Sequence, residues 1–250
     1  MNIIFKTTAR LAFGLVIISS VLTSCKKDEE VADCTPDPAQ TVSFHFDHMF
    51  AGETFGLDSP YNFDGVDVKF QRVSYFMSNF MLMDDDGGSQ MMDGEVMMIS
   101  AAESHSGNIG VTDLDHVHMM SFILGLDSIT NHLDPITAEA PLNDPAMHWN
   151  WNPTGGYKFI RVDGERDITG DGNFESFEIH VATDVMKRAI SGMMVHENVA
   201  ADGLTIHMSV DYNKFFENID FSTETLEGTH GAGAITTLVA DGAATAFAIE

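Results

Sequence analysis

Apolar and polar residues alternate along much of the chain after residue 41. In the first run, Val42, Phe44 and Phe46 alternate with polar residues, so their side chains share one face of a predicted strand. Asp/Gly-rich turns punctuate the chain, and only residues 184–190 and 213–218 resemble short helices. The other predicted strands cover residues 66–70, 75–83, 95–100, 117–125, 147–151, 157–162, 174–181, 203–211 and 233–240. The pattern predicts a single all-β domain, an antiparallel β-sandwich or a barrel-like Greek key.

The N-terminus follows a different pattern. Lys6 and Arg10 precede the apolar run of residues 11–18, which is shorter than the roughly 20 residues of a membrane-spanning helix. This order of charge and apolar run is typical of a secretory signal peptide. The run leads into Leu-Thr-Ser-Cys, which ends at Cys25 and resembles the lipobox of bacterial lipoproteins. We therefore expect residues 1–24 to be cleaved and Cys25 to carry lipid.

Residues 25–40 are acidic and contain two prolines, which predicts a tether between the lipid and a β domain at residues 41–250. The expected location is the outer membrane of a Gram-negative bacterium, with the lipid as the only membrane attachment. The run Lys27-Asp-Glu-Glu30 resembles a surface-export signal but equally fits a solvated tether, so the periplasmic face and the cell surface both stay open. Cys34 is the one cysteine besides Cys25, so the fold cannot rest on a disulfide framework.

The net charge of the chain is −26 at pH 7. A surface of this sign repels phosphate backbones and anionic lipid, which argues against nucleic-acid binding and favours cations as ligands. The chain also has 11 histidines. Metal binding is therefore the function class that the composition favours.

Histidines on predicted strands are the first candidate ligands, because imidazole binds copper and zinc. His48, His180 and His207 each lie on a separate strand, and each could equally be a structural or exposed histidine. His116 and His118 share one face of another strand, a spacing that suits a metal but also arises by chance.

Two further segments carry possible chemistry. Trp149 and Trp151 are the only tryptophans, and their default role is packing in the core. The segment from Asp167 to Glu178 has the spacing of an EF-hand-like calcium loop, although a predicted strand follows it in place of a helix. The loop positions are occupied by Asp167, Thr169, Asp171, Asn173 and Glu178; an ordinary Asp/Gly turn is the alternative reading.

Several short motifs occur in order from residue 46 to residue 211, and they are Phe46-Asp-His48, Tyr75-Phe-Met-Ser-Asn79, Phe122-Ile-Leu-Gly-Leu-Asp127, Met147-His-Trp-Asn-Trp151, Gly156-Tyr-Lys-Phe159, Val162-Asp-Gly164, Phe177-Glu-Ile-His180 and Ile206-His-Met-Ser-Val-Asp211. Together, in this order, they resemble the MbnP-like family. Members are all-β, copper-associated extracytoplasmic proteins, often encoded beside a dihaem cytochrome c peroxidase-like partner, MbnH, that oxidises a tryptophan to kynurenine.

The resemblance implies copper ligation by His48, His180 and His207, and oxidation of Trp149 or Trp151. His148 stands where the family has an aromatic residue, which either adds a ligand or removes the oxidation. His116 and His118 lie outside the family pattern and receive no role from it.

These observations predict a non-enzymatic, copper-binding lipoprotein in copper acquisition or handling. The sequence offers no nucleophile with a paired base and no carboxylate pair placed for acid–base catalysis. The alternative hypothesis is a calcium-stabilised surface interaction or adhesion module.

Overall fold

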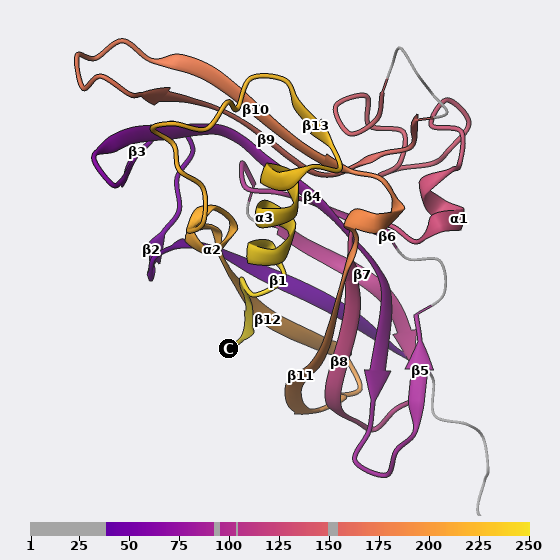
Figure 1. Ribbon diagram of the computed structural model, residues 1–250. Coiled ribbons are helices and arrows are strands. Elements are labelled where there is room, and N and C mark those ends of the chain that lie inside the picture. The colour runs from indigo at the N-terminus through magenta and orange to yellow at the C-terminus, as the bar shows by residue number, and fades with distance from the viewer. Residues whose placement is uncertain (1–38, 93–95, 104, 150–154) are drawn as a thin grey trace, which may run out of the picture. The chain divides into compact units, whose positions relative to one another are not determined.

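The computed structural model describes residues 39–92, 96–103, 105–149 and 155–250, which form two β-sheets and a few short helices (Figure 1). The predicted signal, Cys25, Cys34 and Trp151 lie outside the described residues. The all-β, sandwich-like class predicted from the alternation is confirmed. Among the described residues, no helix has the length and apolar character needed to cross a membrane.

The first sheet is built around β1 (Gln40–Phe50), the strand with the clearest alternation. Val42, Phe44 and Phe46 are buried, while the residues between them are partly exposed. The remaining strands of this sheet are β2 (Glu53–Thr54), β7 (His105–Thr112), β12 (Leu204–Asp211) and β14 (Phe247–Ile249), and the main order is β14-β12-β1-β2 with β7 paired to β1.

The second sheet is organised by β4 (Val66–Met83), a continuous strand where the sequence predicted two. Its order is β11-β8-β4-β9-β10-β13, and three short strands also pair with β4. The bounds are β3 (Pro60–Phe63), β5 (Ser89–Met91), β6 (Val96–Ser100), β8 (His116–Leu124), β9 (Lys158–Asp167), β10 (Glu175–Ala182), β11 (Arg188–Asn198) and β13 (Thr229–Gly231).

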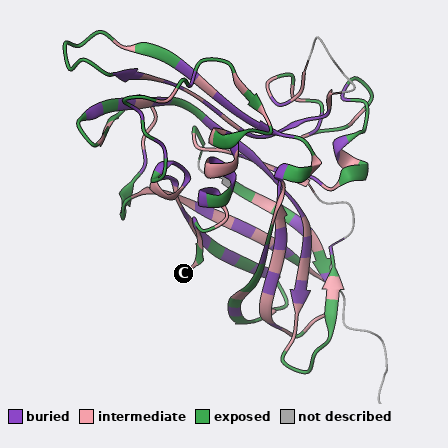
Figure 2. Cartoon of the chain, in the orientation of Figure 1, coloured by how far each residue is buried: buried purple, intermediate pink, exposed green. Residues whose placement is uncertain are grey.

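The core lies between the two sheets, as the buried positions in Figure 2 show. Phe44 of β1 meets Phe80 of β4, with ring centroids 5.5 Å apart. A second aromatic group surrounds Phe70 of β4, whose ring stacks on Phe216 at 4.4 Å. Buried aromatic side chains of this size contribute much of the free energy of folding, and they fix the two sheets against each other.

Two strand pairs are parallel, in contrast to the antiparallel sheets predicted. β1 runs parallel to β12, and β10 runs parallel to β13. Parallel pairing needs a long crossover connection, and both pairs have one because their members are far apart in the sequence. Alternation along a single strand carries no information about the direction of its partner.

The helices are α1 (Ser128–Asn131), the 3₁₀ turn η2 (Asp184–Met186), α2 (Tyr212–Phe216) and α3 (Ala234–Ala243). The prediction of a strand at residues 233–240 is therefore wrong, because α3 occupies this segment. The buried side chains of α3, Thr236, Val239, Ala240 and Ala243, recur every three or four residues and form one helical face. A short run rich in Ala, Thr and Val is ambiguous, because both periods fit it.

Two other predicted helices have different outcomes. The one at residues 213–218 corresponds to α2. The one at 184–190 is wrong beyond the single turn η2, because Arg188 already begins β11. The chain continues as a strand there because β8 offers its free edge for pairing.

Candidate metal centre

The strongest candidate site forms where β10 meets β13. Their parallel register places His180 opposite His230. The two imidazole rings stack, with centroids 4.6 Å apart and planes 2° from parallel. The segment before β9 brings Trp149 alongside, with its ring 5.9 Å from His180 and 5.4 Å from His230.

Two carboxylates face these imidazoles. Nε2 of His180 lies 3.0 Å from Oδ1 of Asp163, and Nε2 of His230 lies 2.8 Å from Oε1 of Glu178. The potential ligand atoms of Glu178, His180 and His230 all lie within 4.8 Å of one another. A carboxylate only accepts, so Nε2 of each ring donates, and in a neutral His180 ring Nδ1 keeps the lone pair.

Nδ1 of His180 is the unusual atom of this group. It is buried and has no hydrogen-bond partner among the described residues. A buried polar atom without a partner costs free energy, and structures rarely keep one without a reason. A metal-binding histidine commonly donates its other ring nitrogen to a carboxylate, as His180 does to Asp163. The donor set therefore fits an imidazole-preferring metal ion.

The electrostatics favour a neutral imidazole and an ionised carboxylate. Burial lowers the pKa of His180, although the hydrogen bond and negative charge of Asp163 act in the opposite direction. For Asp163, burial raises the pKa, but hydrogen bonds from His180 and Arg161 prevail and hold the pKa at about 2. Neutral imidazole is the form that binds metals.

Lys158 holds Trp149 in place. Its ammonium lies 4.7 Å from the centre of the Trp149 ring and donates to the carbonyl oxygens of Ala146 and His148. Burial lowers the pKa of Lys158. Through these contacts Lys158, the first residue of β9, holds the segment that carries Trp149 against the sheet.

The centre is reachable from outside. His180 is 4% exposed, whereas the side chain of His230 is 38% exposed. Asp163 and Glu178 also line a surface pocket of about 360 Å³. A small ion can therefore approach without unfolding of the sheet.

His48 does not belong to this centre. It lies on the inner face of β1, and Nε2 donates to the carbonyl of Glu103 at 3.0 Å. Its Nδ1 consequently accepts a hydrogen bond from the hydroxyl of Tyr212, at 2.8 Å. Because both ring nitrogens are engaged, His48 has the contacts of a structural histidine.

His207 lies on the opposite face of the same sheet. It is exposed on β12, where its ring is 5.3 Å from that of His45. The parallel register pairs His207 with His45, and His48 with the buried Val210. The three histidines implied by the family resemblance are therefore not brought together, because one belongs to the other sheet and the remaining two face opposite ways.

The expected calcium loop is a β-hairpin turn. Asp167 is buried, and its carboxylate accepts hydrogen bonds from the backbone of Gly170 and Gly172. Asp171 accepts from Asn173. Glu178 lies across from Asp163 on β10, because a strand extends by about 3.3 Å per residue and carries the last loop position away. Thr169 lies in the same turn, and among the described residues neither of the two groups that could hold a metal ion includes Asp167 or Asp171.

The secondary candidates fall in two places. His116 and His118 are on β8, and both lie close to Asp85 in the turn after β4. In the second sheet, β4 and β9 separate β8 from β10, so this pair is remote from His180. His148 pairs with Tyr157 through the backbone, its Nδ1 is buried without a described partner, and burial lowers its pKa.

Sequence reasoning missed His230. It lies on a strand of three residues, too short to show alternation, and only the pairing of β13 with β10 brings it to His180. The flanking Gly228 and Gly231 mark a turn but say nothing about its partner.

A family model and a solved structure both relate this chain to MbnP. The family model MbnP matches residues 39–232. Among solved structures, MbnP from Methylosinus trichosporium is similar, with a TM-score of 0.54 and 17% sequence identity over 77% of this chain and 83% of that one. No curated protein sequence matches the chain. At this identity the structural likeness concerns the fold.

Proposed function

The chain belongs to the MbnP family, and from this premise we propose that it is a copper-binding protein of the bacterial cell envelope, with its copper at the centre formed by His180, His230 and Glu178. The supporting observation is the buried, partnerless Nδ1 of His180 within a stacked imidazole pair. Imidazole suits copper in either common oxidation state. The proposed ligand set therefore keeps His180 from the set implied by the resemblance, and has His230 and Glu178 in place of His48 and His207.

Asp163 orients the imidazole ring of His180 without binding the copper itself. It is ionised well below neutral pH and accepts the hydrogen bond of His180, which fixes the ring and raises its basicity as a ligand. Arg161 neutralises the rest of the carboxylate, with two of its nitrogens within 2.9 Å of Oδ2. Asp163 is thereby kept as a partner of His180.

Trp149 is the tryptophan that we propose as the oxidised residue. Its ring is next to both imidazoles, so an oxidised side chain there would lie beside the copper. The proposed oxidant is the dihaem cytochrome c peroxidase-like partner of the MbnH type. His148 directly precedes Trp149 and is partly exposed. Whether the oxidising partner reaches Trp149 beside this histidine is tested by the peptide mapping described below.

The proposed location and mode of action follow from the sequence. The signal at residues 1–24 and the lipobox at Cys25 support export and lipid anchoring in the outer membrane. The proposed role is binding and handing on copper, without catalysis by this chain.

Copper analysis of single variants tests the centre. The full chain, expressed with and without the dihaem partner, is loaded with copper, and the affinity is measured by competition with a chelator. His230→Ala should weaken copper binding at least tenfold, and His180→Gln should do the same without leaving a large cavity. His207→Ala is the matched control, since it removes an exposed histidine from a strand of the other sheet.

Two results would contradict the proposal. Unchanged copper affinity in both His180→Gln and His230→Ala would exclude this centre. Loss of affinity in His207→Ala alone would restore the ligand set implied by the family. Peptide mapping around residue 149 separately reports whether Trp149 becomes kynurenine when the partner is present.

A further inference from the structure

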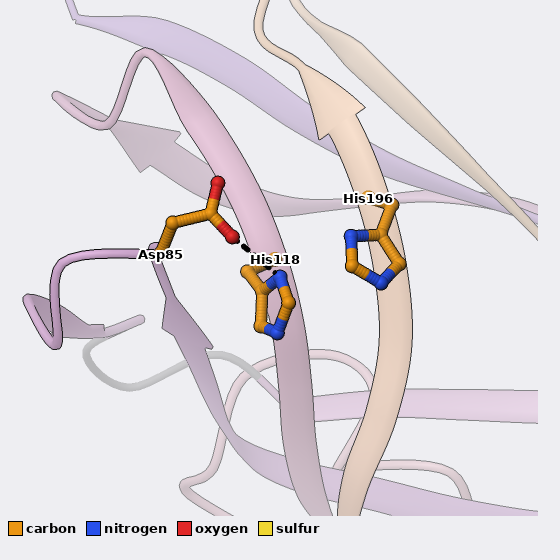
Figure 3. A group of neighbouring side chains, drawn as sticks. All are labelled: Asp85, His118 and His196. Atoms are coloured by element: carbon orange, nitrogen blue, oxygen red, sulfur yellow. Dashed lines mark ion pairs between the residues drawn. The ribbon is translucent and has the colours of Figure 1, made fainter.

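A second group of histidines lies at the opposite end of the strand order of the second sheet. In the order β11-β8-β4-β9-β10-β13, the centre at His180 is on β10 and β13, whereas this group is on β8, β11 and the turn after β4. Asp85, His118 and His196 have ligand atoms that all lie within 4.8 Å of one another (Figure 3). The ring of His116 is 6.5 Å from His118 and 6.4 Å from His196.

A β-bulge places His196 in this group. β11 pairs Met194 with Met119 and Glu197 with Val117, so Val195 and His196 together oppose the single residue His118. His196 has φ of 54°, in the left-handed region that non-glycine residues seldom adopt. Bulges re-aim side chains and recur beside functional sites. The result is that the rings of His196 and His118 are 4.3 Å apart, edge to face.

The turn between β4 and β5 supplies the carboxylate. Asp84 holds the turn, because its Oδ1 accepts from the backbone of Asp86 at 2.9 Å and of Gly88 at 2.7 Å. Asp85 is left to face β8. Its two oxygens lie 2.6 Å from Nδ1 of His118 and 3.0 Å from Nδ1 of His116, and Figure 3 shows the carboxylate turned towards His118.

The two Nδ1 atoms carry the inference. Both are buried, and they face the two oxygens of one carboxylate at ion-pair distance. The carboxylate and the two imidazoles thus direct potential ligand atoms towards the same small region. A metal ion bound there would take the place of the protons that these contacts otherwise need.

We propose that Asp85, His118 and His196, with His116 as the fourth ligand, bind a divalent transition-metal ion of the Zn²⁺ or Cu²⁺ type. Imidazole and carboxylate are the ligands of these ions, in sites of four ligands. Metal–nitrogen bonds of about 2.1 Å require ligand atoms about 3.4 Å apart in a tetrahedron. The ligand atoms lie within 4.8 Å of one another, and Asp85 and His196 are exposed, so a movement of about 1 Å or little more closes the group around an ion.

The bound ion would join three pieces of chain: the turn after β4, the strand β8 and the bulge of β11. This site is independent of the copper centre proposed above, because the two groups share no residue. Both could be present in one molecule, which makes metal stoichiometry the decisive measurement.

Titration of the full chain with Zn²⁺, and separately with Cu²⁺, tests the site. Asp85→Asn keeps the size of the side chain on an exposed turn and should lower the affinity of one site at least tenfold. His196→Ala should remove the same site. Asp86→Asn, on the same turn with the same change of charge, and His132→Ala, an exposed histidine elsewhere, are the matched controls and should bind as the unchanged protein does.

Each outcome separates the two sites. Under the proposal, a His230→Ala protein keeps this site, and the metal still raises its melting temperature, whereas the shift is lost in Asp85→Asn. In the Cu²⁺ form, the nitrogen couplings in the electron paramagnetic resonance spectrum should decrease in His196→Ala. If Asp85→Asn and His196→Ala bind the same number of ions with the same affinity as the unchanged protein, no site exists here. Far-ultraviolet circular dichroism of each variant verifies the fold.

Discussion

The role of Asp163 gives the sharpest test of the centre at His180. Asp163→Asn keeps the shape of the side chain, and the amide oxygen can still accept from His180, now 3.0 Å from the carboxylate. The variant loses the negative charge that also holds Arg161, whose nitrogens lie 2.7 to 3.2 Å from the carboxylate oxygens. Removing the carboxylate partner of a metal-binding histidine typically weakens binding 10- to 100-fold. We therefore expect copper affinity to fall by about 1.4–2.8 kcal/mol.

The same variant has a predicted pH signature. Asp163 has a pKa of about 2 in the folded chain, below its ordinary value of 3.8. The stabilisation that this shift represents is fully present above the ordinary value and is lost as the pH falls towards 2. Urea midpoints measured between pH 5 and pH 2 should therefore fall less steeply for Asp163→Asn than for the unchanged protein.

The control for both measurements is Asp241→Asn on α3. It removes the same charge and also breaks a carboxylate–arginine pair, with Arg188 at 2.7 Å, but none of its contacts reaches the centre. Copper affinity that stays the same in Asp163→Asn would refute the orienting role. A loss of a thousandfold or more would instead indicate that Asp163 binds the metal directly.

Three further predictions concern stability. His48→Ala removes the nitrogen that accepts the hydrogen bond of the Tyr212 hydroxyl, so urea denaturation should show a loss of about 1–3 kcal/mol while copper affinity is unchanged. A loss of copper without a loss of stability would contradict the structural role. Gly242→Ala puts a methyl group against the backbone oxygen of Lys214, and the displacement of α3 from α2 should cost about 1–3 kcal/mol in thermal unfolding, whereas an unchanged melting temperature would mean that the helices separate freely. Asp167→Ala should cost about 1 kcal/mol by removing two backbone hydrogen bonds of the hairpin, and calcium should leave the melting temperature of the unchanged protein where it is; a calcium-dependent rise that disappears in the variant would restore the calcium loop.

Part of the fold could be predicted because it is local. The alternation of Val42, Phe44 and Phe46 fixes which face of β1 is buried, whatever the strand packs against. The run at 234–243 could not be assigned in this way, because its short, small residues fit a strand and a helix equally well. In the structure the buried side chains of this run recur every three or four residues, and Gly242 packs closely against Lys214 of α2, a tertiary contact that the local pattern does not show.

The candidate site divides in the same manner. His180 could be identified as a candidate ligand from its strand and from the family motif, and Trp149 as a candidate for oxidation from the motif alone. His230 could not, because its position depends on β13 pairing with β10 in parallel, across some 50 residues. The bulge that turns His196 towards His118 is likewise a product of pairing between β8 and β11.

The sequence by itself determined the all-β class, the buried face of β1, the acidic, histidine-rich composition and the family. It also determined which residue types are available to hold a metal. Only the tertiary structure decided which histidines meet, because strand direction, register and bulges are set by partners distant in the chain. A one-residue step along a strand reverses the face of a side chain, and this is why His48 and His207 face away from each other while His180 and His230 stack.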